Sequence, residues 1–194
     1  MPRQINYVAL VAGVVTLVLI AASVFVPWWQ FNVGNPALAS VNFSPVNFNF
    51  AIFNTVLTVP IIWALNLACL LTLLAGGIAL LVYSVIPAKS YAKSLLGFGY
   101  KKPLYAVILF LVELFVLYLS VRLLTGVNLP LVGSTALQLP EIFSGGITVK
   151  VVVSAFFNWT FYLSIAVVVL CFAARIYHGK AAKPPATVTV NPKN

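Results

Sequence analysis

A stretch of 85 consecutive residues between Arg3 and Lys89 contains no charged side chain. Average globular chains contain about 25% charged residues, which keep their surfaces soluble. This chain has only 7%, together with 62% apolar residues and a mean hydropathy of +1.09. Water is a poor solvent for such a surface, so the sequence predicts an integral, multi-pass membrane protein.

Four apolar segments are long enough to cross a membrane as helices. A hydrocarbon core of about 30 Å takes about 20 helical residues to cross. The predicted spans cover residues 7–26, 59–86, 104–124 and 156–176. Pro27 and Pro87 directly follow spans. Pro60 and Pro103 lie at starts, where the missing N–H costs nothing. The second span is the longest, so we expect it to tilt or project beyond the bilayer.

The Lys and Arg residues fall mostly on one side of this arrangement. Cytoplasmic segments carry an excess of these residues. If both termini are cytoplasmic, nine of the eleven basic residues lie inside. They are found at the N-terminus, in the loop 87–103, at the end of the fourth span and in the tail 177–194. These nine are Arg3, Lys89, Lys93, Lys101, Lys102, Arg175, Lys180, Lys183 and Lys193. Only Arg122 and Lys150 remain outside, so both termini are predicted to be cytoplasmic.

Aromatic residues at the predicted helix ends agree with this orientation. Trp and Tyr are enriched where a membrane meets water. All four tryptophans fall at predicted outer ends, namely Trp28, Trp29, Trp63 and Trp159. Four tyrosines fall at inner ends, namely Tyr7, Tyr83, Tyr105 and Tyr177. We expect these side chains to anchor the helices among the lipid headgroups.

Each predicted helix carries one stripe of small or polar residues. Lipid gives helices no hydrophobic reason to associate, so small residues permit close approach and polar residues link helices. The stripes contain Ala9, Gly13, Thr16 and Ser23, then Asn66, Gly77 and Ser84, then Ala106, Glu113 and Ser120, and finally Ser164 and Cys171. The predicted fold is an all-α membrane protein of one domain over residues 1–194, built as an antiparallel bundle of four transmembrane helices.

The two outer segments, residues 27–58 and 125–155, contain strand-like stretches. Polar and apolar residues alternate over residues 41–50, with Pro45 shifting the phase, and β-branched residues dominate residues 147–153. Alternation with a period of two is typical of a half-buried strand. Because a lone pair of strands is marginal in water, we expect both segments to join in one small extracellular β-sheet capping the helices. Irregular loops lying at the interface are the alternative.

Four spans, a longer first outer segment and strands in both outer segments resemble the layout of claudin-type tetraspans. In that family the first outer loop carries a Trp, then Gly-Leu-Trp and two cysteines. Here Pro27-Trp28-Trp29 is the nearest feature, while Cys69 and Cys171 both lie within predicted spans. The resemblance implies the layout alone, without the loop disulfide, and no junction or adhesion role is carried over.

Glu113 lies at the centre of the third predicted span. A charged carboxylate there costs about 2.5–3.5 kcal/mol on insertion scales, so it should be neutral, paired or in a wet cavity. Asn66 is the best available partner by depth. One interpretation is functional: Glu113 serves in a proton or ion relay or at a quinone site. The other is structural: Glu113 is an acid that bonds between helices or to another subunit. The structural interpretation is favoured, because a transport path needs several polar groups.

No catalytic, cofactor or metal site is predicted, and we expect the chain not to be an enzyme. Haem in a helical bundle usually requires His or Met ligands, and the chain offers only His178 and Met1. Zinc-ligand spacings and hydrolase, metalloprotease and phosphate-loop motifs are absent from the sequence. The net charge is +9, and the basic residues flank apolar segments. This arrangement favours membrane lipid over nucleic acid as the partner of the protein.

Two classes of function remain. The first is a non-catalytic accessory or scaffold subunit of a larger membrane or cell-surface assembly, or a self-associating protein. The alternative is a small transporter or a ligand- or quinone-binding component that works around Glu113. Uncharged strands with open edges invite pairing with another chain, so other subunits or copies of this chain are the expected partners. The candidate outer contact surface contains Trp28, Trp29, Phe43, Phe48, Phe50 and Val151.

The outer segments suggest two further properties. Asn42-Phe43-Ser44 is a sequon that permits N-glycosylation of Asn42. The outer segments carry one carboxylate, Glu141, and one amine, Lys150. A surface so poor in charge changes little where acid protonates carboxylates, which points to an acidophilic microbe such as an archaeon.

Overall fold

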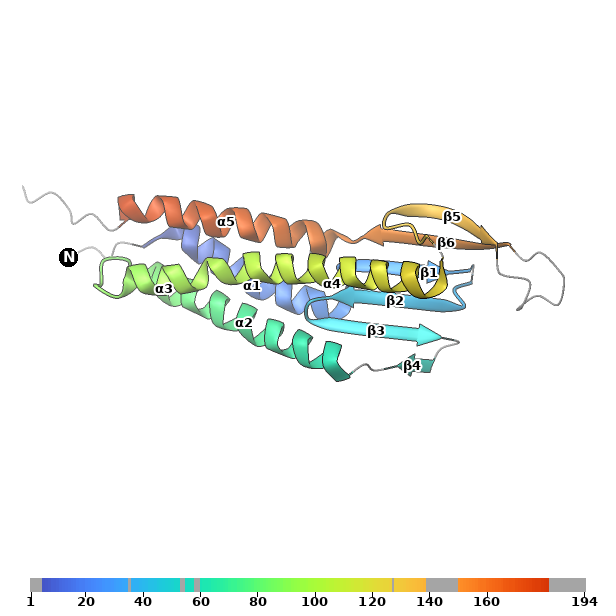
Figure 1. Ribbon diagram of the computed structural model, residues 1–194. Coiled ribbons are helices and arrows are strands. Elements are labelled where there is room, and N and C mark those ends of the chain that lie inside the picture. The colour runs from blue at the N-terminus through green and yellow to red at the C-terminus, as the bar shows by residue number, and fades with distance from the viewer. Residues whose placement is uncertain are drawn as a thin grey trace, which may run out of the picture.

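The computed structural model describes residues 5–34, 36–52, 55–57, 60–126, 128–138 and 150–181. Its helices are α1 (Tyr7–Phe25), α2 (Pro60–Val85), α3 (Ala92–Gly99), α4 (Lys101–Thr125) and α5 (Trp159–Ala181). They make four candidate membrane spans, because α3 and α4 form a single apolar span, Ala92–Leu123. The helices gather at one end of the molecule and a sheet lies at the other (Figure 1). The predicted four-helix antiparallel bundle is confirmed.

The third span differs most from its prediction. It has 32 residues, which corresponds to about 48 Å of helix, against a hydrocarbon core of about 30 Å. Tyr100 joins α3 to α4 with helical dihedral angles, φ −69° and ψ −24°. Pro103 therefore lies inside a nearly continuous helical segment instead of at its start. This span, and not the second, is the longest, and its far end runs alongside the sheet (Figure 1).

Glycines bring α2 close to its neighbours on two sides. A Cβ atom added to Gly13 of α1 would lie 3.1 Å from the carbonyl oxygen of Gly77 and 2.8 Å from the Leu81 side chain. A Cβ atom on Gly99 of α3 would lie 3.1 Å from the carbonyl oxygen of Gly76. Small residues at these crossings replace the hydrophobic driving force that lipid does not provide. The adjacent glycines Gly76 and Gly77 of α2 thus belong to two different interfaces, with α3 and with α1.

The predicted stripes face the interior on three of the four spans. The buried members are Ala9, Gly13, Thr16 and Ser23 on α1, Asn66, Gly77 and Ser84 on α2, and Ser164 and Cys171 on α5. On α4 the stripe departs from this rule. Ala106 is buried, Glu113 is half-buried and Ser120 is exposed. The outer half of α4 therefore turns its stripe away from the other helices.

One antiparallel sheet combines the two long connections, as the sequence predicts. Its strands are β1 (Trp29–Val33), β2 (Ala39–Ser44), β3 (Asn47–Ile52), β4 (Thr55–Leu57), β5 (Gly133–Gln138) and β6 (Lys150–Phe157). The spatial order is β4-β3-β2-β1-β6-β5. The pairing of β1 with β6 joins the first connection to the second. Four candidate spans and strands in both long connections are thus present.

Two boundaries differ from the sequence-based expectations. The alternating stretch over residues 41–50 is a hairpin, in which Ser44 pairs with Asn47 across a turn formed by Pro45 and Val46. Proline suits a turn because it lacks a ladder N–H. The fourth span begins at Trp159 instead of at residue 156, because Phe156 and Phe157 extend β6 opposite β1. Of the strand expected over residues 147–153, residues 147–149 lie outside the described part of the chain.

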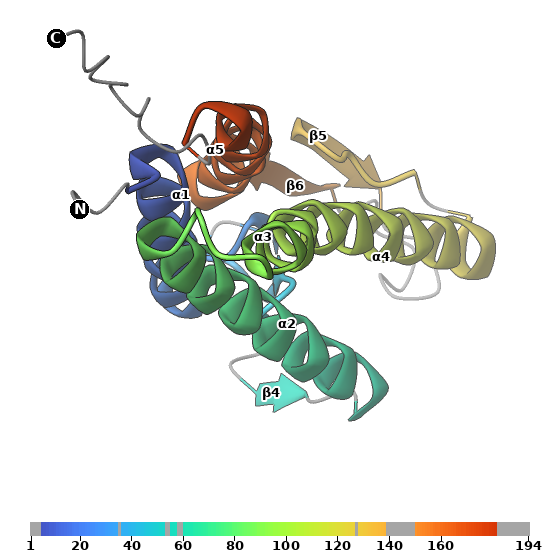
Figure 2. The same cartoon turned by 90° about the vertical axis from the view of Figure 1, so that its left-hand side faces the viewer.

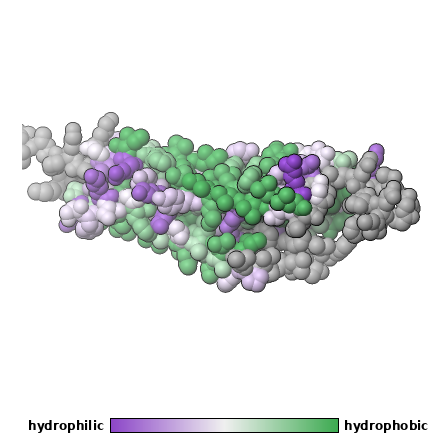
Figure 3. Space-filling model, viewed as in Figure 1, coloured by the Kyte–Doolittle hydropathy of each residue, from purple (hydrophilic) through white to green (hydrophobic). Residues whose placement is uncertain are grey.

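The sheet has an apolar face and a polar face. Trp29 and Phe31 of β1, Phe43 of β2, and Val153 and Ala155 of β6 are all buried. These residues occupy alternate positions in register with one another, as expected for a sheet packed on one side only. The opposite face carries the half-exposed polar residues Gln30, Asn32, Ser40, Asn42 and Ser154. Over the helices the surface is a broad hydrophobic area, with hydrophilic residues toward the α3 end (Figure 3).

Candidate functional site: an intramembrane groove between α2 and α4

The helices α2 and α4 lie close together near α3 and diverge toward their opposite ends (Figure 2). At the near end Gly76 of α2 lies close to α4, because a Cβ atom added there would be 2.8 Å from the Lys102 side chain. Two adjoining cavities, of about 330 and 420 Å³, occupy the space where they separate. Both cavities are lined by Ile62 of α2 and Leu117 of α4, so they form one groove.

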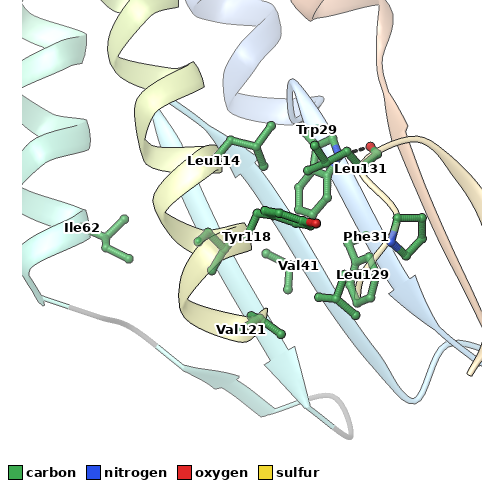
Figure 4. Close-up of a pocket in the computed structure, with 11 residues that line it drawn as sticks. Trp29, Phe31, Val41, Ile62, Leu114, Tyr118, Val121, Leu129 and Leu131 are labelled. Atoms are coloured by element: carbon green, nitrogen blue, oxygen red, sulfur yellow. Dashed lines mark hydrogen bonds between the residues drawn. The ribbon is translucent and has the colours of Figure 1, made fainter. Parts of the chain in front are cut away.

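The cavity beside the sheet is almost entirely apolar. Leu114, Tyr118 and Val121 of α4 face Trp29 and Phe31 of β1 across it (Figure 4). The segment after α4 closes one wall, where the indole Nε1 of Trp29 donates a hydrogen bond of 2.9 Å to the carbonyl oxygen of Leu131 (Figure 4). This cavity is therefore a hydrophobic slot between the projecting end of α4 and the sheet.

The second cavity lies deeper among the helices and contains Glu113. Its remaining lining is apolar apart from Ser120. Both Glu113 carboxylate oxygens are covered by neighbouring atoms, and neither has a hydrogen-bond partner among the described residues. Buried polar atoms in native structures nearly always have a partner. A covered acid without a described partner is therefore a candidate binding group.

Asn66 does not supply the partner that the sequence suggested. Its side-chain oxygen and nitrogen are covered, and within the described residues neither atom has a hydrogen-bond partner, so no hydrogen bond links it to Glu113. The expectation rested on equal depth alone. The helices α2 and α4 diverge away from α3 (Figure 2), and equal depth alone does not bring side chains of diverging helices into contact. Within the described part of the chain, the side chains of Glu113 and Asn66 are thus both without a hydrogen-bond partner.

The groove opens toward the lipid. Three of its lining residues are well exposed, with Leu65 at 43%, Val112 at 52% and Val116 at 54% of their accessible area. The lining of the two cavities runs along α4 from Leu109 to Val121, which is roughly 18 Å of helix. An elongated apolar body with one hydrogen-bonding group fits this shape and chemistry.

The predicted outer contact surface is largely buried. Trp28 is 0%, Phe43 2% and Trp29 3% exposed, so these side chains are not open to another chain or to headgroups. Phe43 lies inside because it packs against Phe110 of α4, and Trp29 because the segment after α4 lies beside it. Trp28 packs against Phe110, with ring centroids 5.1 Å apart, and against Phe161.

The other members of that predicted surface are placed only in part. In the backbone register Phe48 lies opposite Phe43, and Phe50 lies opposite Val41, while their side chains fall outside the described part. Val151 of β6 is half-buried. By contrast, Trp63 and Trp159 are 60% and 55% exposed at the starts of their helices, as expected for anchors at a membrane interface.

A buried polar cluster at the α3 end was not predicted. The Asn6 amide nitrogen donates to the Tyr83 hydroxyl at 3.0 Å, and this hydroxyl lies 2.7 Å from His178 Nδ1. The Asn6 side-chain oxygen accepts from the N–H of Ala9 at 3.1 Å and caps α1. Tyr83 is fully buried and is no interface anchor. Pairing His178 with residues far away in sequence needs the helix packing, which no local pattern reveals.

The remaining sequence predictions have no direct bearing on the groove. Asn42 lies in β2, opposite Gln30 of β1 and Asn49 of β3, and its glycosylation stays a prediction. Among the described residues, no group of three or more His, Cys, Asp or Glu side chains is placed to hold a metal ion. No protein-family model matches the chain, and no curated protein matches its sequence.

Proposed function

We propose that this protein is a non-catalytic accessory subunit of a membrane assembly, and that the groove between α2 and α4 receives a transmembrane helix of a neighbouring subunit. The observation that carries the proposal is the Glu113 carboxyl group, which lies in the groove without a partner among the described residues. A neighbouring helix with a Ser, Thr, Asn or Gln side chain at this depth would supply the missing hydrogen bond. Such bonds link helices within membranes.

The shape of the groove supports a helix as its occupant. The lining follows α4 over several turns, and the exposed residues Leu65, Val112 and Val116 border it on the lipid side. A neighbouring helix would cover these side chains and fill a space that α2 and α4 leave open. Filling such space gains packing contacts, which contribute to helix association in lipid together with interhelical hydrogen bonds.

Site-specific photo-cross-linking from within native membranes tests the proposal. A photoreactive residue at Val116, inside the groove, should form a discrete protein adduct. The matched control is Val169 of α5, which is 62% exposed and does not line the groove. We expect the control to give lipid adducts only. Lipid adducts alone from both positions would contradict the proposal.

The second candidate function is the binding of a lipid-soluble ligand such as a quinone. It is favoured by the same apolar lining around a single acid, since small-molecule sites are mostly apolar with a few placed polar groups. Native mass spectrometry of the protein extracted in mild detergent separates the two functions. A bound small molecule of fixed mass, lost in a Glu113→Leu variant, would favour the ligand over the helix.

We further propose that both termini are cytoplasmic and that the sheet lies outside the cell. The support is the bias of nine basic residues against two. The sheet has two edge strands, β4 and β5, and Ser134, Thr135 and Ala136 of β5 are exposed. Uncharged edges of this kind pair readily with other chains, so we propose that β5 contacts a neighbouring subunit or another copy of this chain.

A further inference from the structure

A second cavity system lies at the α3 end, at the opposite end of the helices from the sheet. It has a volume of about 410 Å³ and is lined by Ser90, Lys93, Ser94, Tyr100, Lys101 and Arg175. Three separate elements contribute cations to it, because Lys93 belongs to α3, Lys101 to α4 and Arg175 to α5. The fold thus collects three positive charges around one polar hollow.

The aromatic ring of Tyr100 organises two of these cations. The guanidinium carbon of Arg175 lies 5.6 Å from the ring centroid, and Lys101 Nζ lies 5.9 Å from it. Both distances are within the range of a cation–π attraction. Gly97 also lines the cavity, and a Cβ atom there would meet nothing within 4 Å. The ring therefore keeps the cations close together, while the glycine leaves the hollow open.

Among the described residues, no acidic side chain lines this cavity. The whole sequence holds two carboxylate side chains, Glu113 and Glu141. Glu113 is the only one among the described residues, and it lies in the groove between α2 and α4. Like charges held close together repel one another, so an external anion would stabilise the arrangement. The anion must also be one that is abundant where this cavity lies.

The surroundings of the cavity are typical of a lipid headgroup region. Exposed tyrosines lie on the same helices as these cations and close to them in sequence, with Tyr105 of α4 at 52% and Tyr177 of α5 at 42% of their accessible area. Such residues mark the boundary between hydrocarbon and water. Lys101 is the first residue of α4, and Arg175 lies near the end of the span Trp159–Gly179, so both cations are at the end of their helices, where lipid phosphates are expected.

We propose that this cavity binds the phosphate group of an anionic phospholipid. Arg175 would hold two phosphate oxygens in the bidentate manner of a guanidinium group. Lys93 and Lys101 would add their ammonium groups, and the exposed hydroxyls of Ser90 and Ser94 would donate further hydrogen bonds. Basic pockets between transmembrane helices commonly bind anionic headgroups.

Lipid exchange measured by native mass spectrometry tests this site. The purified protein is offered phosphatidylglycerol and phosphatidylcholine in equal amounts, and the retained lipid is quantified. We expect the wild-type protein to retain phosphatidylglycerol preferentially. Lys93→Gln and Arg175→Gln should each lower that preference about fivefold, since each charge near the surface contributes about 1 kcal/mol. Arg175→Lys keeps the charge and should retain more of the preference than Arg175→Gln.

The matched control is Lys89→Gln, which removes an exposed charge at the same end but outside the cavity. An equal loss of lipid preference in this control would overturn the proposal. The preference would then come from the general attraction between basic residues and anionic lipid. A third arm adds inorganic phosphate without lipid. If inorganic phosphate at millimolar concentration displaced phosphatidylglycerol and protected the protein against heat equally well, the site would belong to free phosphate and the lipid would be excluded. Elution of each variant at the wild-type volume confirms that it is folded.

Discussion

The indole Nε1 of Trp28 donates a hydrogen bond of 2.7 Å to the hydroxyl oxygen of Ser23. The Ser23 hydroxyl in turn donates to the carbonyl oxygen of Leu19 at 2.6 Å. Both side chains are buried. This bond ties the last turn of α1 to the residue that begins the path into β1, so the sheet and the bundle are joined by a buried polar contact.

Replacing Ser23 should therefore destabilise the junction. A Ser23→Ala variant leaves the Trp28 N–H buried without a partner, which costs about 1–3 kcal/mol. The expected result is a lower unfolding temperature of the purified protein in detergent, measured by tryptophan fluorescence. The control is Ser120→Ala, because Ser120 is exposed, and it should unfold like the wild type. Equal unfolding of both variants would show that the bond contributes no net stability.

The contact between Gly13 and Gly77 predicts a second loss of stability. Leucine at position 13 would collide with Leu81 and crowd the carbonyl oxygen of Gly77, forcing α1 away from α2. Overpacking of this kind typically costs about 1–3 kcal/mol. We expect Gly13→Leu to unfold at lower denaturant than wild type. Gly179→Leu is the control, because a Cβ atom there meets nothing within 4 Å. This variant should unfold at the same denaturant concentration as the wild type.

Glu113 should matter for assembly and not for the stability of the isolated chain. If Glu113 bonded between helices, as the sequence favours, Glu113→Leu would weaken the bundle. Among the described residues, however, none accepts a hydrogen bond from this carboxyl group or donates one to it. We expect the Glu113→Leu variant to unfold like the wild type. Less partner protein should co-purify with it in mild detergent than with the wild type. Glu113→Gln should keep the partner, since an amide can both donate and accept. Loss of chain stability in the Leu variant would instead indicate an internal partner.

The free edge of β5 gives a prediction about association. Thr135 is exposed on this edge strand, and Thr135→Lys should reduce cross-linking to neighbours because edge charges block strand pairing. Val152 is 55% exposed but lies on β6, which is paired on both sides, so Val152→Lys is the control. Backbone pairing also predicts little dependence on salt. Exclusive monomers in native-membrane cross-linking would end the scaffold hypothesis.

Membrane orientation is tested by labelling single introduced cysteines with an impermeant reagent. Cys69 and Cys171 are buried, so they should give little background. Ser40→Cys, in β2 of the sheet, should react from outside intact cells. Ser90→Cys, in the turn before α3, should react only after the membrane is opened. The reverse labelling pattern would show that the protein has the opposite orientation in the membrane.

The helices were predictable because their signals are local, whereas the site was not. Apolar length and proline positions place α1 and α2 within about two residues, and the small-residue stripe on α1 is buried as expected. The burial of Trp28 depends on Phe110 of α4, and Trp29 is bonded to Leu131, so both depend on contacts between residues far apart in the sequence. The groove arises from the angle between α2 and α4, and neither helix encodes that angle in its own pattern. Glu113 was found because one charged residue in an apolar span is conspicuous.

The central pairing of β1 with β6 has a consequence for biosynthesis. The paired residues, such as Trp29 and Phe157, are more than 100 positions apart, and they directly follow α1 and directly precede α5. A nascent chain with only its first three spans inserted has no β6, so one side of β1 has no strand beside it. Arrival of the last helix beside the first closes this gap and completes the sheet. Correct pairing of the sheet thus reports that every span has entered the membrane.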